Sequence, residues 1–126
     1  MKKKRVCVYL RVDSCSELDD VERQKEIICE YVKRKLNNSF IEYYIDDGYS
    51  GRDFNRPTIN KLINDTESNE IDIIVVSDYS KISRNLIDLY KFVNEYLIPR
   101  NIQLISSKEG PYKDYVKNID YIIKHN

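Results

Sequence analysis

Five basic side chains lie near or after the ends of predicted strands, and several hydroxyl groups lie near them in the sequence. Arg11 lies near the end of an apolar and aromatic run, residues 6–12, and two serines follow within residues 13–16. A guanidinium in a central strand must meet an anion, because it is otherwise unpaired at a large energetic cost. We therefore expect an anion to bind at the end of this strand.

The elements that position these residues alternate between strand and helix along the whole chain. Strands are expected at residues 6–12, 40–45, 71–77 and 102–106, and helices from residue 16, from Pro57, over 86–97 ending before Pro99, and over 115–123. This order is typical of a single α/β domain with a mainly parallel central sheet of four to five strands flanked by helices. The loops that leave the carboxyl ends of parallel strands lie together, and ligands bind between them.

That arrangement gathers the basic residues on one edge of the sheet. They are Arg11, Arg52, Arg56, Lys81 and Arg84. Planar bidentate donors with hydroxyls nearby suit a phosphoryl group, whose transfer needs neutralised charge and a positioned nucleophile. Any single arginine is more simply explained by pairing with a nearby aspartate, and the available ones are Asp46, Asp47, Asp53 and Asp78. Pairing explains five converging cations less well.

Composition limits the classes of function. Lys plus Arg and Asp plus Glu number 21 each, so the net charge is zero and any binding of a polyanion must be local. The three cysteines match no zinc pattern and indicate a reducing compartment, with Cys7 and Cys29 expected as small buried residues. The apolar run after the basic start is only of strand length. We expect a cytoplasmic protein that uses no metal and no cofactor and does not contact a membrane.

Three motifs in order make the chain resemble the catalytic domain of serine recombinases, the resolvase/invertase superfamily. They are residues 9–12 (YLRV) with Gln24 in the first helix, residues 47–51 (DGYSG) followed by 54–57 (FNRP), and residues 78–85 (DYSKISRN). The residue sequence of the middle motif is most like that of the large serine recombinases. The resemblance covers roughly residues 5 to 106, and three motifs in the right order are more specific than any one of them.

The resemblance implies a DNA recombination reaction in which a serine hydroxyl attacks a phosphodiester and forms a phosphoserine link to DNA. Arginines stabilise the charge at phosphorus without a metal. Carried over by position, the phosphate-binding arginines are Arg11, Arg56 and Arg84, and the supporting polar residues are Gln24, Ser50, Ser80 and Lys81.

Two positions depart from the pattern of the superfamily. Asp13 occupies the place of the nucleophilic serine, and a carboxylate there would repel a DNA phosphate and form at best a hydrolysable acyl phosphate. Ser14 is the alternative nucleophile if the turn is bulged or shifted by one residue. Lys81 replaces an arginine, which keeps the charge but loses the bidentate fork. A relative that binds DNA without cleaving it is therefore a second interpretation.

The resemblance also concerns partners. We expect residues 1–126 to form one catalytic domain, with residues 112–126 at the start of a subunit-contact helix and with the separate DNA-binding region absent. The implied partners are DNA and other copies of the chain, as a homodimer or homotetramer assembled through the C-terminal helix. Packing of that helix back onto its own sheet is the equally simple alternative.

Two other classes of function remain open. Asp13, Asp78, Ser107 and Lys108 resemble the layout of a phospho-acceptor receiver domain that holds magnesium. That interpretation needs a second carboxylate beside Asp13 and gives the arginines no role. A non-catalytic interaction domain is the third class, and it is favoured if the arginines are held in internal ion pairs.

Overall fold

The computed structural model describes residues 4–12, 18–36, 39–47, 56–68 and 71–117. Its elements are β1 (Lys4–Val12), α1 (Leu18–Lys35), β2 (Ser39–Asp47), α2 (Pro57–Ser68), β3 (Ile73–Val76), the 3-10 turn η1 (Tyr79–Lys81), α3 (Leu86–Phe92), the π-helical turn η2 (Val93–Leu97), the 3-10 turn η3 (Ile98–Arg100), β4 (Gln103–Ser106) and β5 (Gly110–Pro111). Residues 112–117 are helical.

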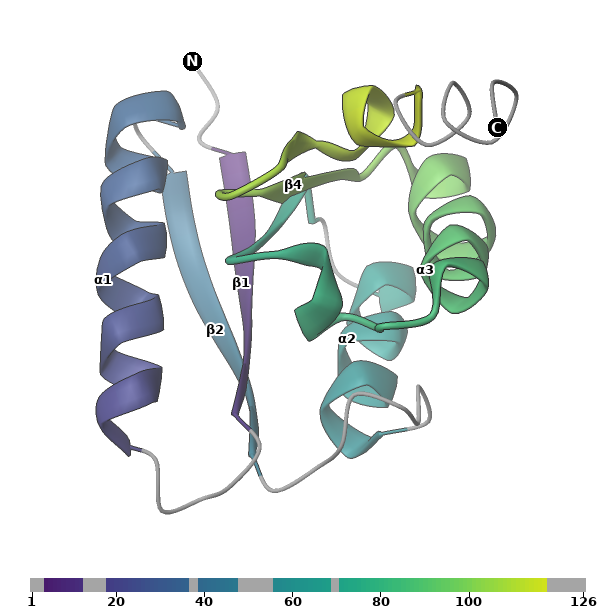
Figure 1. Ribbon diagram of the computed structural model, residues 1–126. Helices are drawn as coiled ribbons and strands as arrows, with labels where there is room; N and C mark the ends of the chain where they lie inside the picture. The colour runs from purple at the N-terminus through teal and green to yellow at the C-terminus, as the bar shows by residue number, and fades with distance from the viewer. Residues whose placement is uncertain (1–3, 13–17, 37–38, 48–55, 69–70, 118–126) are drawn as a thin grey trace, which may run out of the picture.

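Five strands of the described chain form one sheet in the order β2-β1-β3-β4-β5. The pairs β1 with β2, β1 with β3 and β3 with β4 are parallel, and only β5 runs antiparallel, against β4. Figure 1 shows α1 on one side of this sheet and α2 and α3 on the other. The mainly parallel α/β sheet expected from the sequence is confirmed, with five strands.

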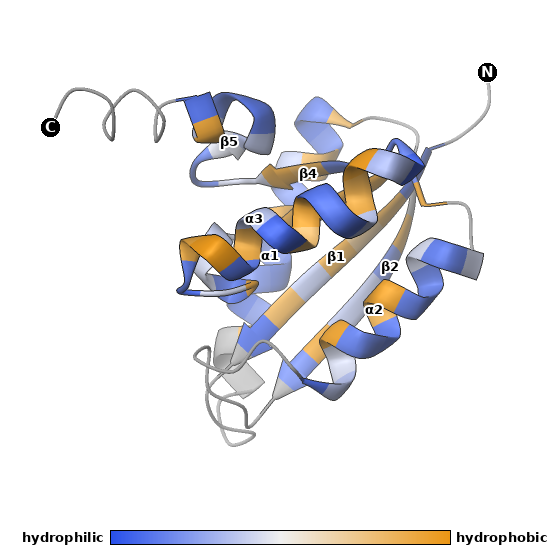
Figure 2. Cartoon of the chain, turned by 90° about the vertical axis from the view of Figure 1, so that its right-hand side faces the viewer, coloured by the Kyte–Doolittle hydropathy of each residue, from blue (hydrophilic) through white to orange (hydrophobic). Residues whose placement is uncertain are grey.

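Each face of the sheet has its own apolar core. Val8 and Leu10 of β1 pack with Ile28 of α1 on one face. The residues that alternate with them along the strand, Cys7 and Tyr9, point to the opposite face and pack with α2 and α3. β1 is therefore buried on both faces, as its continuous apolar run predicts. Figure 2 shows the alternating hydrophobic and hydrophilic bands along α2 and α3 that this packing requires.

Local chemistry explains where the helices begin. Pro57 is the first residue of α2, where its fixed φ suits a helix and its missing N–H is not needed. Asn85 caps α3, because its side-chain oxygen accepts hydrogen bonds from the backbone N–H groups of Ile87 and Asp88. Arg56 therefore lies directly before α2, and the segment after β3 ends at the Asn85 cap of α3.

Two expected boundaries are wrong in detail. β2 extends to Asp47, beyond the expected end at residue 45, so Asp46 lies in the strand. The helix expected to end before Pro99 continues through a π-helical turn and then a 3-10 turn that contains Pro99. A short antiparallel strand at Gly110–Pro111 was not expected, and Gly110 has a φ of 87°, which favours glycine.

The two described cysteines differ in their surroundings. Burial raises the pKa of Cys7 to about 12, so this thiol behaves as a small apolar group at neutral pH. Cys29 is only half-buried, and its Sγ lies 2.9 Å from the Tyr43 hydroxyl on β2. The expectation of a buried position is confirmed for Cys7 and wrong for Cys29, because α1 covers the edge strand β2 incompletely.

Candidate functional site

Arg11 stands at the carboxyl end of β1 and is only 2% exposed. Its Nε donates a hydrogen bond to the backbone carbonyl oxygen of Lys81 at 3.2 Å, and its Nη2 donates to that of Ser80 at 3.3 Å. Both carbonyls belong to η1, the turn that follows β3. The central strand and the η1 turn therefore hold this guanidinium in one orientation.

Arg56 comes from a different part of the chain and reaches the same turn. It is 1% exposed, and its Nη2 donates to the carbonyl oxygens of Ile82 at 2.5 Å and Lys81 at 3.3 Å. The Lys81 carbonyl oxygen thus accepts hydrogen bonds from both Arg11 and Arg56. Two arginines that are 45 residues apart in the sequence converge on one carbonyl group. We call Arg11 and Arg56 the arginine pair.

A buried carboxylate completes this layer. Asp46 of β2 is fully buried, and its Oδ2 lies 3.0 Å from Nε of Arg56 in an ion pair. The same oxygen accepts a hydrogen bond from the Tyr9 hydroxyl at 2.5 Å. Burial and this hydrogen bond raise the pKa of Tyr9, so the phenol remains protonated and keeps donating. The Arg56 guanidinium also lies 5.9 Å from the centre of the Tyr9 ring.

Asp46 and Tyr9 were not predicted as site residues, although both are built into the site. The missing information was the length of β2. Once that strand includes Asp46, the parallel register places Asp46 opposite Arg11. Alternation along β2 would then have placed Asp46 on the same face of the sheet as Tyr44. The sequence offered Asp46 only as one of four aspartates able to pair with an arginine.

Gln24 joins α1 to the same strand end. Its side chain is buried, and Nε2 donates a hydrogen bond to the carbonyl oxygen of Arg11 at 3.1 Å. The structure therefore brings Gln24 to Arg11.

The residues of the third motif lie more openly. Ser80 is exposed and its hydroxyl donates to the Asp78 carboxylate, while the Lys81 side chain is half-buried. Arg84 is exposed and lines a hollow of about 300 Å³ with Ser80, Asp78 and Lys108. Asp13, Ser14, Ser50 and Arg52 lie outside the described residues.

A carboxylate after β4 holds the η1 turn in place. Glu109 Oε1 accepts hydrogen bonds from the backbone N–H of Tyr79 at 2.8 Å and from the Ser106 hydroxyl at 3.0 Å. The Tyr79 hydroxyl donates to the carbonyl oxygen of Gly110 at 2.6 Å. The Tyr79 ring packs against Tyr112 and Tyr115 of the helical segment that follows. The carbonyls that hold the arginine pair are therefore fixed by the end of β4.

The geometry bears on the classes left open by the sequence. Arg56 is held in an internal ion pair, which is the condition stated for a non-catalytic interaction domain, whereas the hydrogen bonds described for Arg11 go to neutral carbonyls. Among the described residues, no three His, Cys, Asp or Glu side chains cluster as they would around a metal ion. In the same part of the chain, no helix has the length and apolar composition needed to cross a membrane.

Sheet order and site together define an open, mainly parallel α/β domain with buried arginines at the carboxyl edge, the usual place for a ligand in such folds. The family model described as "Resolvase, N terminal domain" matches residues 6–123. The chain therefore belongs to the resolvase family of serine recombinases. The sequence resemblance to this superfamily is confirmed. No curated protein sequence matches the chain at a significant level.

Solved structures agree with this assignment. The N-terminal catalytic domain of TP901-1 integrase is 28% identical over 85% of this chain and 79% of that one, with a TM-score of 0.74. A resolvase family site-specific recombinase from Streptococcus pneumoniae is 21% identical, covers 98% of this chain and 90% of its own, and has a TM-score of 0.72. The C-terminal catalytic domain of ISC1926 TnpA, an IS607-like serine recombinase, is 21% identical over 94% and 79%, with a TM-score of 0.70. The last two show the fold alone.

Proposed function

We propose that this chain is the catalytic domain of a site-specific DNA recombinase, with residues 1–126 as one domain. Membership of the resolvase family implies DNA binding and oligomeric assembly. The observation that carries the proposal is the convergence of Arg11 and Arg56, both almost fully buried, on the carbonyl oxygen of Lys81. Burying two guanidiniums costs free energy of desolvation, and a phosphate bound at their edge would offset this cost.

Arg56 has capacity for such a ligand. Within the part of the chain that the structure describes, its Nη1 is buried and has no hydrogen-bond partner. A buried donor of this kind normally finds an acceptor, and a phosphate oxygen supplies one. Asp46 pairs with the Nε side of the same guanidinium. The carboxylate would thus orient Arg56 while another edge of the guanidinium contacts the ligand.

The proposed reaction is a phosphoryl transfer between DNA strands. A serine Oγ attacks phosphorus and loses its proton, the bond to one deoxyribose oxygen breaks, and that oxygen takes up a proton as it leaves. Arg11, Arg56 and Arg84 would stabilise the negative charge that builds on the phosphoryl oxygens. Gln24, Ser50, Ser80 and Lys81 would support the strand ends and loops around them. The deoxyribose hydroxyl of another strand then attacks the same phosphorus and loses its proton, the bond between phosphorus and the serine Oγ breaks, and the serine regains a proton.

Asp13 decides whether this chain performs the reaction itself. A carboxylate at the position of the nucleophile predicts that no stable link between protein and DNA forms there. Ser14 is the next residue in the sequence and carries a hydroxyl. The proposed function therefore has two forms, cleavage by Ser14 or binding of DNA without cleavage.

Covalent trapping separates these two forms. The chain is incubated with a pool of nicked suicide duplexes of randomised sequence and digested, and nucleotide-modified peptides are sought by mass spectrometry. An adduct on Ser14 means that the chain cleaves DNA. An adduct that appears only in Asp13→Ser means that the arginine site persists without the chemistry. Absence of an adduct in both proteins would contradict the proposed catalytic origin of the site.

We further propose that the chain acts in the cytoplasm, where its DNA substrate is found, as a homodimer or homotetramer assembled through residues 112–126. The helical segment 112–117 supports this assembly, whereas Tyr112 and Tyr115 pack on Tyr79 of their own domain. Sedimentation equilibrium of the chain and of Val116→Asp tests this point. A monomer at every concentration would contradict the proposed assembly.

A further inference from the structure

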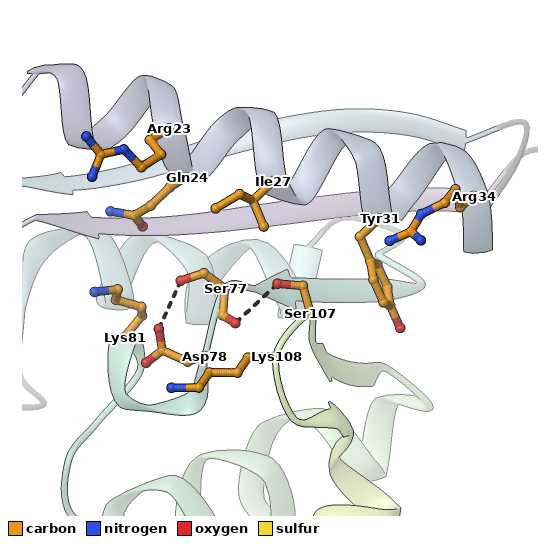
Figure 3. Close-up of a pocket in the computed structure, with 10 residues that line it drawn as sticks. All are labelled: Arg23, Gln24, Ile27, Tyr31, Arg34, Ser77, Asp78, Lys81, Ser107 and Lys108. Atoms are coloured by element: carbon orange, nitrogen blue, oxygen red, sulfur yellow. Dashed lines mark hydrogen bonds between the residues drawn. The ribbon is translucent and has the colours of Figure 1, made fainter.

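A second hollow of about 370 Å³ lies between α1 and the loops that leave β3 and β4. Its α1 wall consists of side chains spaced three or four residues apart, which places them in one row along the helix. They are Arg23, Ile27, Tyr31 and Arg34, with Gln24 beside them. Figure 3 shows this row facing Lys81, Asp78 and Lys108 across the opening. We call this hollow the α1 groove.

The α1 groove carries an excess of positive charge in a chain whose net charge is zero. Arg23, Arg34, Lys81 and Lys108 line it, against the single carboxylate of Asp78. That carboxylate accepts hydrogen bonds from the hydroxyls of Ser77 and Ser80. Four cations against one anion make this groove suitable for a ligand with several negative charges.

Apolar surface lies among these cations. Ile27, which follows Arg23 in the row, is 52% exposed. The Tyr31 ring, which precedes Arg34, is half-buried. A wall of this kind contributes little to binding a small inorganic anion. Cations interleaved with an aromatic ring suit a polymer that carries both phosphates and flat bases, as single-stranded DNA does. An acidic peptide would satisfy the cations but offers no regular series of planar rings.

The α1 groove adjoins the arginine pair. Gln24 lines the groove and donates to the Arg11 carbonyl oxygen, while the Lys81 side chain lines it and the Lys81 carbonyl accepts from both arginines. We propose that the α1 groove binds single-stranded DNA and leads an unpaired strand away from the arginine pair. This inference deepens the proposed function, on which it rests for the identity of the polymer.

The test measures binding of a fluorescein-labelled oligothymidine by fluorescence anisotropy over a range of salt concentrations. Arg34→Ala removes an exposed groove cation that lies outside the proposed catalytic site, and Lys108→Ala removes one from the opposite wall, where Lys108 also borders the hollow of Arg84. The matched control is Lys33→Ala, which removes an exposed cation from the same turn of α1 that does not line the groove. We expect several-fold weaker binding for the two groove variants and a salt slope that is smaller by about 0.7 for each lost phosphate contact. Lys33→Ala should bind as the wild type does.

Tyr31→Leu examines the aromatic part of the groove. Leucine keeps an apolar side chain but has no ring on which a base can stack, so we expect about fivefold weaker binding or more with an unchanged salt slope. A variant that weakened binding only through the salt slope would contradict stacking and, with it, the assignment to single-stranded DNA.

Two further results would overturn the inference. One is equal weakening by Lys33→Ala and Arg34→Ala, which would mean that the charge of α1 and not the groove attracts DNA. The other is displacement of the oligothymidine by polyglutamate as effectively as by unlabelled oligothymidine, which would assign the groove to an acidic peptide.

The trapping experiment keeps this inference separate from the proposed function. If no adduct forms even in Asp13→Ser while the groove variants still weaken oligothymidine binding, the proposed catalysis fails and the groove remains. If adducts form normally and the groove variants bind oligothymidine as the wild type does, the groove assignment fails and the proposed catalysis remains.

Discussion

The arginine pair and the α1 groove present the same kind of charge in opposite structural settings. Arg11 and Arg56 are 2% and 1% exposed, and backbone carbonyls and a buried carboxylate fix their orientation. Arg34 and Lys108 are exposed side chains at the rim of a groove. A fixed cation is ready for a precisely positioned phosphate, whereas an exposed cation tolerates a moving polymer. Substitutions in the first region should therefore affect folding and function together, and those in the second only binding.

The largest effect is expected at Asp46. Asp46→Ala leaves the Arg56 guanidinium buried without its carboxylate and removes the acceptor of the Tyr9 hydroxyl. We expect the free energy of unfolding to fall by about 3–5 kcal/mol, the usual consequence of breaking a buried ion pair. Urea denaturation followed by circular dichroism measures this change.

Glu42→Ala is the matched control, because Glu42 lies on the same strand and pairs with Arg5 at the surface. Its effect should be much smaller, since solvent screens an exposed pair. Equal losses in the two variants would mean that Asp46 does not stabilise a buried charge.

Tyr9→Phe should have the next largest effect. It removes the hydroxyl that donates to Asp46, and we expect a loss of about 1.5–3 kcal/mol because a charged acceptor loses a buried partner. Burial first, and then the hydrogen bond to Asp46, raises the pKa of Tyr9 above its ordinary value of about 10. Unfolding then releases a proton at high pH. The stabilisation is complete below pH ~10 and declines as the pH rises above it.

Urea midpoints of the wild type and Tyr9→Phe, measured below and above pH ~10, isolate this contribution. Burial also raises the pKa of Tyr44 and Tyr79, so both proteins should lose stability in alkali, and the wild type more steeply. Parallel pH profiles would show that Tyr9 ionises as easily in the folded chain as in the unfolded one.

Glu109 connects the arginine pair to the end of β4, and its removal should have an intermediate effect. Glu109→Ala takes the acceptor away from the Tyr79 N–H and the Ser106 hydroxyl, which costs about 1–2 kcal/mol. The specific expectation concerns the η1 turn, where the Tyr79 amide should exchange its hydrogen faster. Glu67→Ala, at a surface pair with Arg100, is the control and should leave this exchange unchanged. Unchanged exchange in Glu109→Ala would mean that other contacts hold η1.

The sequence predicted the sheet well because its central strands carry continuous apolar runs. β1 and β3 lie at the middle of the sheet, and burial on both faces leaves a pattern that is visible without a structure. β5 has only two residues, Gly110 and Pro111, which by composition indicate a break. β5 forms because it pairs with the edge of β4 in antiparallel orientation, and this pairing depends on the tertiary structure.

The site was predicted in part for a similar reason. Arg11, Gln24 and Arg56 belong to sequence motifs, and the structure brings them together, while their roles remain predictions. The role of Asp46 depends on the register of β2 against β1, which no short motif encodes. The α1 groove was not predicted, because Tyr31 fits the apolar stripe of its helix and Arg34 the charged background, and only the structure places them opposite Lys108. The predictions for Asp13, Ser14 and Ser50 remain predictions.

The smallest effects on stability are expected in the α1 groove. Arg34→Ala and Lys108→Ala remove exposed side chains, so the free energy of unfolding should change by no more than about 0.5 kcal/mol. Thermal and urea denaturation of these variants should therefore overlay the wild type while oligothymidine binding weakens. A fall of several kcal/mol in the free energy of unfolding of either variant would mean that the cation stabilises the fold. The arginine pair and the α1 groove would then differ only in exposure. Weaker binding by such a variant could result from unfolding and would no longer indicate a ligand site.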